Sequence, residues 1–499
     1  MTYVEKILQN EIVIAPYCGP QPAYERYGVS YPSRITEEQY KLLKDCGINV
    51  VYGHEDLMNS PWEHQAFEAL DICEKLGMVY FVRDAITYEY CCVGEGKKMY
   101  IEMTEEEKAD LDRRYEASLR KYKDHPAFGG VMFIDEPGSA NFHAIKAGKN
   151  VFDRVCPGKR FYVNLFPMYT TAFQLQYGWA KDGAETDPEY EVYVHTNLER
   201  FQHYFRQFMD TVDPDIVSFD AYPFTRLRDA HNAVHRVLWD MTQYVSSECR
   251  KHGKEYWHFL QVGGRWEYNN NVRITTMGEA NLGISVALGY GAKALELFPG
   301  CNPNVFLGTG DHSGIIDGFG KITEQYPIYQ YAFMQVKAIQ KHLAHAKLQG
   351  MIVSDAPYYG LLPSHEEIRR MEDMDKGAGD TIFEGTLLPE EKDGNCQISE
   401  YKALKGITST TQCIVSCFDN DDETVYFVWN NSPYAASDVT LHFDDEYIFE
   451  HIQRTVTDKS EGKDLTIHAL PAGENVLVRI TGKKQPGLEK KQVAVPTVQ

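Results

Sequence analysis

Two adjacent acids, Asp135 and Glu136, follow the apolar run Val131–Ile134 and precede Pro137. An apolar run of this kind favours a buried strand, and proline cannot continue a strand ladder, so both carboxylates fall at the strand's carboxyl end. Ionised groups are costly beside an apolar strand unless they are paired or used in chemistry. Partial burial raises the pKa of a carboxyl, which suits a general acid such as Glu136. The alternative is that the acid pair caps the next helix or forms a salt bridge to a neighbouring loop.

Other polar and aromatic side chains fall at or near the ends of further predicted strands. Asp220 and Tyr222 stand two apart in Asp-Ala-Tyr-Pro, and the proline forces an extended exit, so both can face the same side. Glu296 lies inside the last strand, where it is either a catalytic acid or the buried partner of Arg83 or Lys293. For Asp84 a helix cap is an equal alternative to a ligand contact, and for His54 a structural hydrogen bond is the commoner role. The candidates for ligand contact are His54, Asp84, Asn164, Gln261 and Trp266, with Tyr222.

Short apolar runs alternate with helical patterns through the first part of the chain, and near-continuous apolar runs are typical of strands buried on both faces. The predicted strands are Ile12–Ala15, Asn49–Gly53, Met78–Arg83, Gly130–Ile134, Phe161–Leu165, Ile216–Asp220, Tyr256–Val262 and Lys293–Phe298. The helical patterns between them include Glu37–Cys46, Trp62–Leu76, Thr104–Lys123, Tyr190–Val212, Arg228–Lys251 and Met277–Gly289. This alternation predicts a (β/α)8 TIM barrel over residues 1–345, in which all strands end at one face. A doubly wound open sheet is the main alternative, but no G-x-G-x-x-G loop follows the first strand.

The pattern changes in the last third of the chain, where short alternating strands are separated by turn residues. These strands are Cys413–Phe418, Thr424–Trp429, Asp438–Phe443, His451–Val456, Leu465–His468 and Asn475–Ile480. They predict an antiparallel β-sandwich over residues 346–482, with a charged insertion near 364–380 and a flexible tail over 483–499. We expect this domain to pack on the barrel, with glycan binding or dimer formation as alternatives.

The composition of this chain of 499 residues limits the kinds of partner that it can bind. Its net charge of −22 argues against nucleic acid and anionic membranes, because both require a basic face. The 33 Tyr, 24 Phe and 6 Trp residues include enough flat faces to stack on sugar rings, although most must belong to the core. Eleven cysteines without a C-x-x-C pair indicate free thiols. With no signal peptide and no long apolar run, we expect a cytoplasmic protein without a membrane span.

The motifs that the chain contains or lacks allow three kinds of chemistry to be compared. No His-x-His or His-Glu-x-x-His occurs, so we expect no metal ion and no cofactor. No G-x-S-x-G follows a strand, which disfavours a serine nucleophile. Carboxylate chemistry remains, and glycoside hydrolysis is a common form of it. A carboxylate separation of about 5–5.5 Å would indicate a retaining pair, and about 6.5–9.5 Å an inverting pair.

Residues 134–137, Ile-Asp-Glu-Pro, resemble the acid/base strand of barrel glycoside hydrolases, where clan A members carry Asn-Glu-Pro and several hexosaminidase-type families carry Asp-Glu. Asp-Ala-Tyr-Pro at 220–223 and Leu-Pro-Ala-Gly-Glu-Asn-Val-Leu-Val-Arg-Ile at 470–480 are similar to segments of such enzymes. The resemblance covers the architecture of most of the chain, while its specific motifs are short and assign no single family. It implies that Glu136 protonates the glycosidic oxygen.

One departure from that resemblance concerns the second carboxylate. In clan A the nucleophilic glutamate ends the seventh strand, where this chain has Gln261. Either Glu267 or Glu296 then supplies the second carboxylate, or no enzymic nucleophile exists. In Asp-Glu hexosaminidases the substrate's own acetamido oxygen attacks, and the resemblance gives Asp135 the task of orienting it. Neighbouring strand residues point to opposite sides, so Asp135 and Glu136 can share a ligand only where the strand turns.

The leading hypothesis is a glycoside hydrolase that cleaves a small β-linked glycoside. Glu136 is its acid, assisted by Asp135, Asp220 or Glu296, and the sugar contacts are Tyr222, Asn164 and Trp266. One alternative is a carbohydrate-binding barrel that has lost catalysis, motivated by Gln261. Another is a barrel hydrolase or lyase that uses the acid pair on a non-sugar substrate. The sugar, the stereochemical outcome and a homo-oligomeric state stay open at this point.

Overall fold

The computed structural model describes residues 1–26, 29–54, 58–91, 98–178, 197–226, 232–234, 237–263, 274–302, 314–357, 397–421 and 423–484. Trp266, Glu267 and the expected insertion near 364–380 lie outside the described residues, as does the expected tail from residue 485 onward. Within the described part, no helix is long and apolar enough to cross a membrane. Nine of the cysteines are described, all as free thiols.

Eight parallel strands form the centre of the first domain. They are β1 (Val13–Pro16), β4 (Val50–Tyr52), β5 (Val79–Val82), β6 (Phe128–Asp135), β7 (Arg160–Leu165), β8 (Ile216–Phe219), β11 (Glu255–Gln261) and β12 (Ala294–Phe298). Hydrogen bonds join them in the order β1-β12-β11-β8-β7-β6-β5-β4. The circle closes between β1 and β4, where the Asn49 N–H donates to the Ile14 carbonyl at 3.1 Å and the Asn49 side chain accepts from the Ile14 N–H at 2.8 Å. The predicted (β/α)8 barrel is confirmed, and each predicted strand overlaps an observed one.

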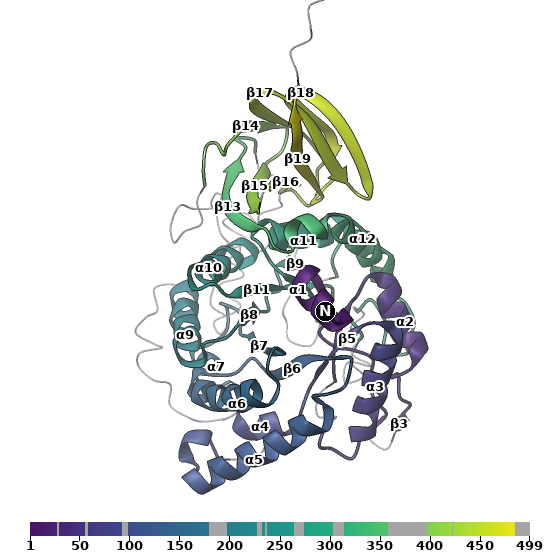
Figure 1. Cartoon of the computed structure of the whole chain (residues 1–499), viewed down its shortest axis with the longest axis vertical. Helices are drawn as coiled ribbons and strands as arrows, with labels where there is room; N and C mark the ends of the chain where they lie inside the picture. The colour runs from purple at the N-terminus through teal and green to yellow at the C-terminus, as the bar shows by residue number, and fades with distance from the viewer. Residues whose placement is uncertain are drawn as a thin grey trace, which may run out of the picture.

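Helices form a ring around these strands (Figure 1). They are α2 (Glu37–Cys46), α3 (Glu63–Leu76), α4 (Ile86–Tyr90), α5 (Glu105–Tyr122), α6 (Phe142–Val155), α7 (Ala172–Tyr177), α9 (Asn197–Val212), α10 (Val237–His252), α11 (Met277–Gly289) and α12 (Gln325–Leu343), with short 3-10 turns at Tyr100–Glu102 and Ser139–Asn141. Thr36, Thr104 and Thr276 cap helix amino ends through their side-chain oxygens. The predicted helix start at Arg228 was wrong. Residues Asn232–Val234 form β10, which pairs with β9 (Phe224–Arg226), so α10 begins only at Val237.

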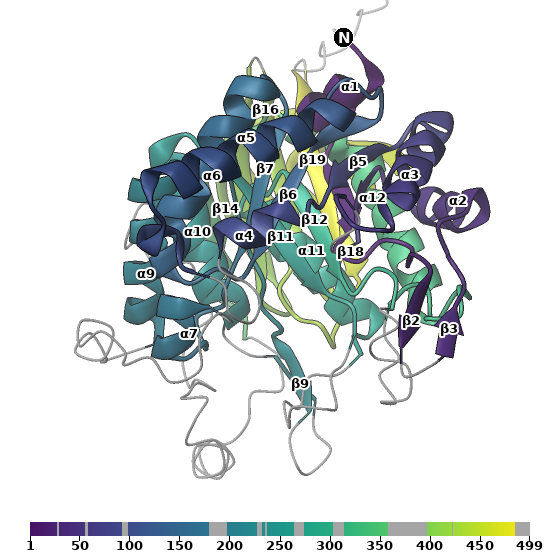
Figure 2. The same ribbon diagram turned by 90° about the horizontal axis from the view of Figure 1, so that it is seen from below.

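Helix α1 (Tyr3–Asn10) closes one end of the barrel, and the opposite end, at which the barrel strands finish, is called the open end. This helix places Val4, Ile7 and Leu8 in one apolar cluster with the inward side chains at the amino ends of the strands. Large rings fill the interior above it, with Tyr52 and Tyr162 stacked at 5.1 Å between centroids. Figure 2 shows α1 at one end, and β9 with the β2–β3 hairpin (Tyr24–Arg26 and Val29–Tyr31) at the other. The carboxyl ends of the strands therefore lie at the end opposite α1.

The C-terminal domain is antiparallel throughout, as predicted. Its strands are β13 (Lys347–Val353), β14 (Leu404–Ser409), β15 (Cys413–Asn420), β16 (Glu423–Asn430), β17 (Ser437–Gln453), β18 (Val456–Leu470) and β19 (Asn475–Lys483). Two separate predicted strands, 438–443 and 451–456, are largely one long strand, β17. Its first part pairs with β14 and its last part with β19, so the sheet bends around a second apolar core.

This β domain stands on the outer side of α11 and α12 (Figure 1). Trp429 and Phe427 join the apolar cluster of the barrel rather than the core of their own domain. Several polar contacts also cross the interface, among them bonds from aromatic side chains. The Trp239 indole N–H donates to Asn431 at 3.1 Å, and the Tyr434 hydroxyl donates to Glu279 at 2.6 Å. The β domain therefore packs on the barrel, as expected.

Candidate active site

A β-bulge near the end of β6 decides where the acid pair points. Met132 lies opposite Tyr162 of β7, and both pack inside the barrel. The register then shifts, so that Phe133 and Ile134 both pack on the outer side and Asp135 comes opposite Asn164. In an unbroken strand Asp135 would face the helices, because side chains alternate. Bulges re-aim side chains in this way next to active sites, and here Asp135 turns into the barrel.

Glu136 leaves the strand in a left-handed conformation, with φ of 45°. Its N–H donates to the Asn164 carbonyl at 2.9 Å, and the Tyr204 hydroxyl donates to the Pro137 carbonyl at 2.7 Å. A non-glycine residue with this φ stores strain of about 1–3 kcal/mol, which surrounding contacts must hold. Half-buried at the open end, Glu136 is therefore next to Asp135 but no longer restricted to the opposite side of a strand.

A chain of polar side chains runs from Asp135 into the barrel. The Asn164 Nδ2 donates to Asp135 Oδ1 at 3.0 Å. The Ser218 hydroxyl lies 3.3 Å from Asn164 Oδ1 and 2.6 Å from Glu296 Oε2. The Tyr162 hydroxyl donates to Ser218 at 3.1 Å. The three consecutive strands β6, β7 and β8, together with β12 beyond β11, thus contribute to one connected network below the open end.

Glu296 is the deepest member of this network and has no exposed surface. The Tyr52 hydroxyl donates to its Oε1. Burial raises the pKa of Glu296 to about 7, and the nearby charge of Asp135 acts in the same direction. Neither of the expected cations, Arg83 and Lys293, is a hydrogen-bond partner of Glu296. Lys293 donates to the carbonyls of Leu343 and Ala346 instead. Glu296 therefore lies beneath the surface that a substrate would touch.

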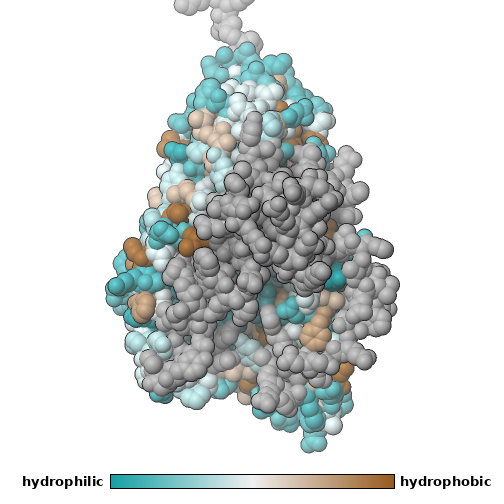
Figure 3. All heavy atoms as spheres, turned by 180° about the vertical axis from the view of Figure 1, so that it is seen from behind, coloured by the Kyte–Doolittle hydropathy of each residue, from teal (hydrophilic) through white to brown (hydrophobic). Residues whose placement is uncertain are grey.

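Asp220 and Tyr222 reach the open end from β8. Asp220 is 5% exposed, and its N–H donates to the Leu165 carbonyl at 3.3 Å. Tyr222 is half-buried, with its ring 5.6 Å from that of Phe298 at the end of β12. Phe298 in turn lies 5.7 Å from Tyr17, which follows β1. Acid and aromatic groups thus lie at the same end of the barrel. Figure 3 views the molecule from behind, where the described surface of the β domain is largely hydrophilic.

Other sequence candidates are placed differently. Asp84 faces the helices, where Asn59 donates to one carboxylate oxygen and Ser118 and Tyr122 donate to the other. Burial raises its pKa despite these bonds. The Gln261 amide accepts from the Phe224 N–H at 2.9 Å and donates to the Phe224 carbonyl at 2.8 Å. His54 is half-buried just beyond β4.

Sequence reasoning missed the groups that hold the network together. Tyr52, Tyr162 and Ser218 were read only as parts of apolar strands, although each stands at an inward position of its strand. Ser218 is the one hydroxyl in the buried run Ile-Val-Ser-Phe, which is a usable signal. Arg83, considered only as a partner for Glu296, is 5% exposed with its guanidinium 5.5 Å from the centre of the Tyr17 ring.

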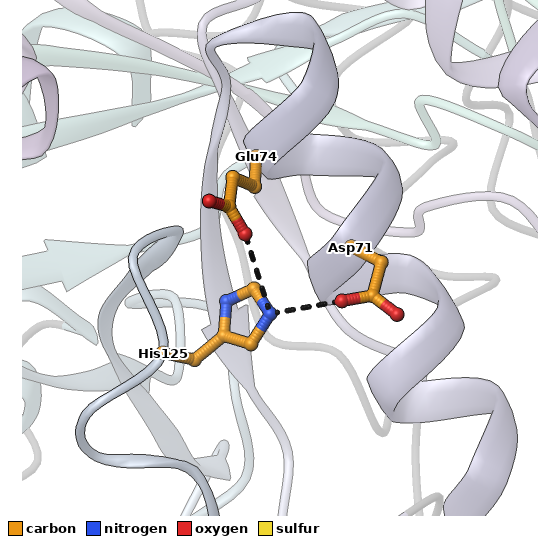
Figure 4. A group of neighbouring side chains, drawn as sticks. All are labelled: Asp71, Glu74 and His125. Atoms are coloured by element: carbon orange, nitrogen blue, oxygen red, sulfur yellow. Dashed lines mark hydrogen bonds and ion pairs between the residues drawn. The ribbon is translucent and has the colours of Figure 1, made fainter.

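One group of described residues has the composition of a metal site, but it lies elsewhere. His125 Nε2 is 3.2 Å from Asp71 Oδ1 and 3.8 Å from Glu74 Oε2 (Figure 4). Asp71 and Glu74 belong to α3, and His125 precedes β6, so the group is at the amino end of the strands. The two carboxylates are 75% and 46% exposed and pair with the imidazole itself. This group is therefore separate from the acids at the open end.

A small cavity lies between β8, β11 and the helices α10 and α11, and it reaches the carboxyl ends of the two strands at Ala221 and Gln261. Its polar lining includes His258 and Glu279. The His258 ring bonds to the Tyr256 hydroxyl, and burial lowers the pKa of His258 to about 3, so the ring stays neutral. Glu279 accepts from Tyr434 and caps α11. These bonds give both groups structural roles.

The fold of this chain, a closed parallel barrel followed by an antiparallel β domain, is similar to that of solved β-galactosidases. A β-galactosidase from Bacillus circulans sp. alkalophilus is similar over 94% of this chain and 99% of its own, with a TM-score of 0.55 and 10% identity. A catalytic mutant of Gan42B, a GH42 β-galactosidase from G. stearothermophilus, is similar over 94% and 98%, with a TM-score of 0.52 and 9% identity. Neither a protein-family model nor a curated protein sequence matches the chain. The resemblance inferred from Ile-Asp-Glu-Pro is thus confirmed for the fold.

Proposed function

We propose that this protein is a glycoside hydrolase that cleaves a small β-linked glycoside, with Glu136 as the general acid. The observation that carries the proposal is the end of β6, where a bulge and a left-handed residue bring two adjacent acids to the open end of the barrel. The shared fold with β-galactosidases supports it. The half-buried rings of Tyr222 and Phe298 offer flat faces for a sugar ring at the same end of the barrel.

In the proposed reaction Glu136 gives its proton to the glycosidic oxygen as the bond from that oxygen to the anomeric carbon breaks. Positive charge develops on the sugar ring, and the Asp135 carboxylate, held by Asn164, is placed to stabilise it or to orient an acetamido group. The Glu136 carboxylate then takes a proton from the water that completes hydrolysis. Among the described carboxylates, Asp220 is our candidate for the second catalytic group. Glu296 is fully buried, and the Gln261 amide is bonded to the Phe224 backbone.

The test compares wild type with Glu136→Gln on aryl β-glycosides of galactose, glucose and N-acetylglucosamine. Removing a general acid lowers kcat by about 10²–10⁴-fold. The loss should be largest for phenyl glycosides and smaller for nitrophenyl glycosides, whose leaving groups need less protonation. Glu105→Gln is the matched control, since its side chain is 91% exposed on α5. Equal kcat for wild type and Glu136→Gln would contradict the assignment, whatever the sugar.

A second candidate is a carbohydrate-binding barrel without turnover. The observation that favours it is Gln261, an amide whose oxygen and nitrogen are both bonded to Phe224 at the end of the seventh barrel strand. Titration calorimetry with the same sugars distinguishes the two. Binding that Glu136→Gln leaves unchanged, with no product released by wild type, favours the binding protein over the enzyme.

A further inference from the structure

Ser218 has one hydroxyl proton and two acceptors within reach. Glu296 Oε2 is at 2.6 Å and Asn164 Oδ1 at 3.3 Å, while Tyr162 donates to the Ser218 oxygen. The hydroxyl can therefore point to only one acceptor at a time. Asn164 is oriented by its other end, because its Nδ2 donates to Asp135. The direction of the Ser218 proton thus distinguishes two states of the network below the open end.

The surroundings of Glu296 contain no opposing charge in hydrogen-bond or ion-pair contact among the described residues. Tyr52 of β4 and Ser218 of β8 donate to it, and in the sheet it lies opposite Ala15 of β1 and Phe259 of β11. The titratable and charged groups that face it or its network are Tyr52, Tyr162, Tyr256 and Asp135, with Arg83 and Asp220 at the ends of β5 and β8. A carboxylate buried without a cation favours its protonated form.

We propose that Glu296 is a positioning residue that stores a proton and, through Ser218 and Asn164, sets the charge state of Asp135. When Glu296 is protonated it donates to Ser218, which then donates to Asn164, so every hydrogen bond points toward the Asp135 carboxylate. When Glu296 is ionised, Ser218 turns back to it and a second negative charge lies near Asp135. Only the activity readout of this inference rests on the proposed function.

The two states differ in energy for physical reasons that act together. Hydrogen bonds in a chain polarise one another, so donors aligned toward Asp135 stabilise its anion. Two like charges in a low-dielectric interior repel, so ionised Glu296 raises the pKa of Asp135 and ionised Asp135 raises that of Glu296. Burial raises the pKa of Glu296 to about 7, so the change between states falls near neutral pH. The coupling must be equal in both directions.

Infrared pH-difference spectra test this without any assay of activity. One component of the carbonyl stretch, that of a buried carboxylic acid, should titrate near pH 7 in wild type, and this band should be missing in Glu296→Gln, while components from other buried carboxyls, such as that of Asp84, should stay. In Asp135→Asn the same band should titrate at a pH lower by about one unit, because a neighbouring charge is gone. The control Glu105→Gln should keep the wild-type titration. A band that persists in Glu296→Gln, or a midpoint that Asp135→Asn leaves unmoved, overturns the inference.

Ser218→Ala isolates the route of the coupling. It leaves the Glu296 carboxyl in place but removes the hydroxyl that bridges to Asn164. The shift caused by Asp135→Asn should therefore be smaller in the Ser218→Ala background. An undiminished shift would mean that the two charges interact only through space, which overturns the role given to Ser218 and Asn164.

The kinetic arm is the pH profile of kcat on the best glycoside. Wild type should show a step near pH 7 that Glu296→Gln lacks, since glutamine keeps the shape and donates to Ser218 at every pH. A step that persists in Glu296→Gln contradicts the inference. If wild type turns over no glycoside, the proposed function fails, and the infrared result still decides the state of Glu296.

Discussion

The ends of two neighbouring strands, β5 and β6, carry an aspartate in the same sequence setting but in opposite structural roles. Asp84 and Asp135 both follow a buried apolar run. Asp84 turns outward and receives bonds from Asn59, Ser118 and Tyr122, which tie the strand to α5. Asp135 turns inward, where Asn164 of β7 holds it at the open end.

The difference arises from strand parity rather than from the type of residue. Strand β5 alternates without interruption, so Phe81 faces the interior and Asp84, three residues later, faces the helices. Strand β6 contains a bulge, which shifts the alternation by one and sends Asp135 to the interior. An acid after an apolar strand is thus a candidate for chemistry only when the register of its neighbours places it on the inner side.

The largest expected effect is a difference in kcat between variants of the two aspartates. Asp135→Asn should lower kcat by about 10²–10³-fold, because it removes charge that stabilises the transition state, and should leave the folded state intact. Asp84→Asn should leave kcat per folded molecule near that of wild type. Steady-state kinetics with an aryl glycoside measure both. Equal losses of kcat in the two variants would break the distinction between the strand ends.

Stability should respond in the opposite order. Asp84→Ala should lower the free energy of unfolding by about 3 kcal/mol, because the buried hydroxyls of Ser118 and Tyr122 lose their acceptor. The measurement is urea unfolding followed by circular dichroism. Asp71→Ala on the exposed face of α3 is the control, with a change within about 0.5 kcal/mol. An unchanged midpoint for Asp84→Ala would show that its bonds do not anchor β5.

How far the sequence predicts this difference can be argued from the same residues. The apolar run before each acid locates both strand ends, because burial on two faces leaves a compositional trace. The bulge at Phe133 leaves no such trace in the sequence, because it depends on how β6 pairs with β7. The direction of the Asp135 side chain depends on this bulge, so it cannot be predicted from the sequence either. The left-handed Glu136 is equally a product of the surrounding contacts.

Long-range pairing explains the other differences as well. Residues 228–236 continue a helical pattern locally, yet Asn232–Val234 pair with Phe224–Arg226 and form a strand. The amide of Gln261 bonds to the backbone of Phe224, which follows the preceding barrel strand, and no local pattern in the sequence indicates this partner. Sequence patterns thus place elements well, while the partner of each polar group is decided by packing.

A third prediction concerns Glu296, the most deeply buried residue of the network below Asp135, and the pH dependence of stability. The pKa of Glu296 rises from 4.5 to about 7 on folding, so the folded state binds the extra proton between these values. Wild type should therefore lose stability as pH rises from about 4.5 to about 7, by up to about 3 kcal/mol at about 1.4 kcal/mol per unit. Glu296→Gln should lack this decline, so its stability relative to wild type should increase across that range and level off above it. Urea unfolding at several pH values measures the difference. Parallel curves for the two proteins would mean that Glu296 is ionised in the folded state throughout.

The smallest expected effect compares a glycine next to each strand. A Cβ at Gly138, just after Glu136 and Pro137, would come 2.3 Å from the backbone nitrogen of Gly178, so Gly138→Ala must displace the turn that carries the acid pair. Gly77, just before β5, has φ of 65°, and a Cβ added there would meet no atom within 4 Å. Gly77→Ala should cost about 1 kcal/mol through its backbone conformation alone and leave kcat unchanged. Gly138→Ala should cost about 2 kcal/mol and also lower kcat, because Glu136 is moved away from Asp135. Unfolding and kinetics on the same samples separate the two effects. If Gly138→Ala destabilises the fold without changing kcat, the position of Glu136 does not limit the reaction, and the general acid must be sought among the other carboxylates of the open end.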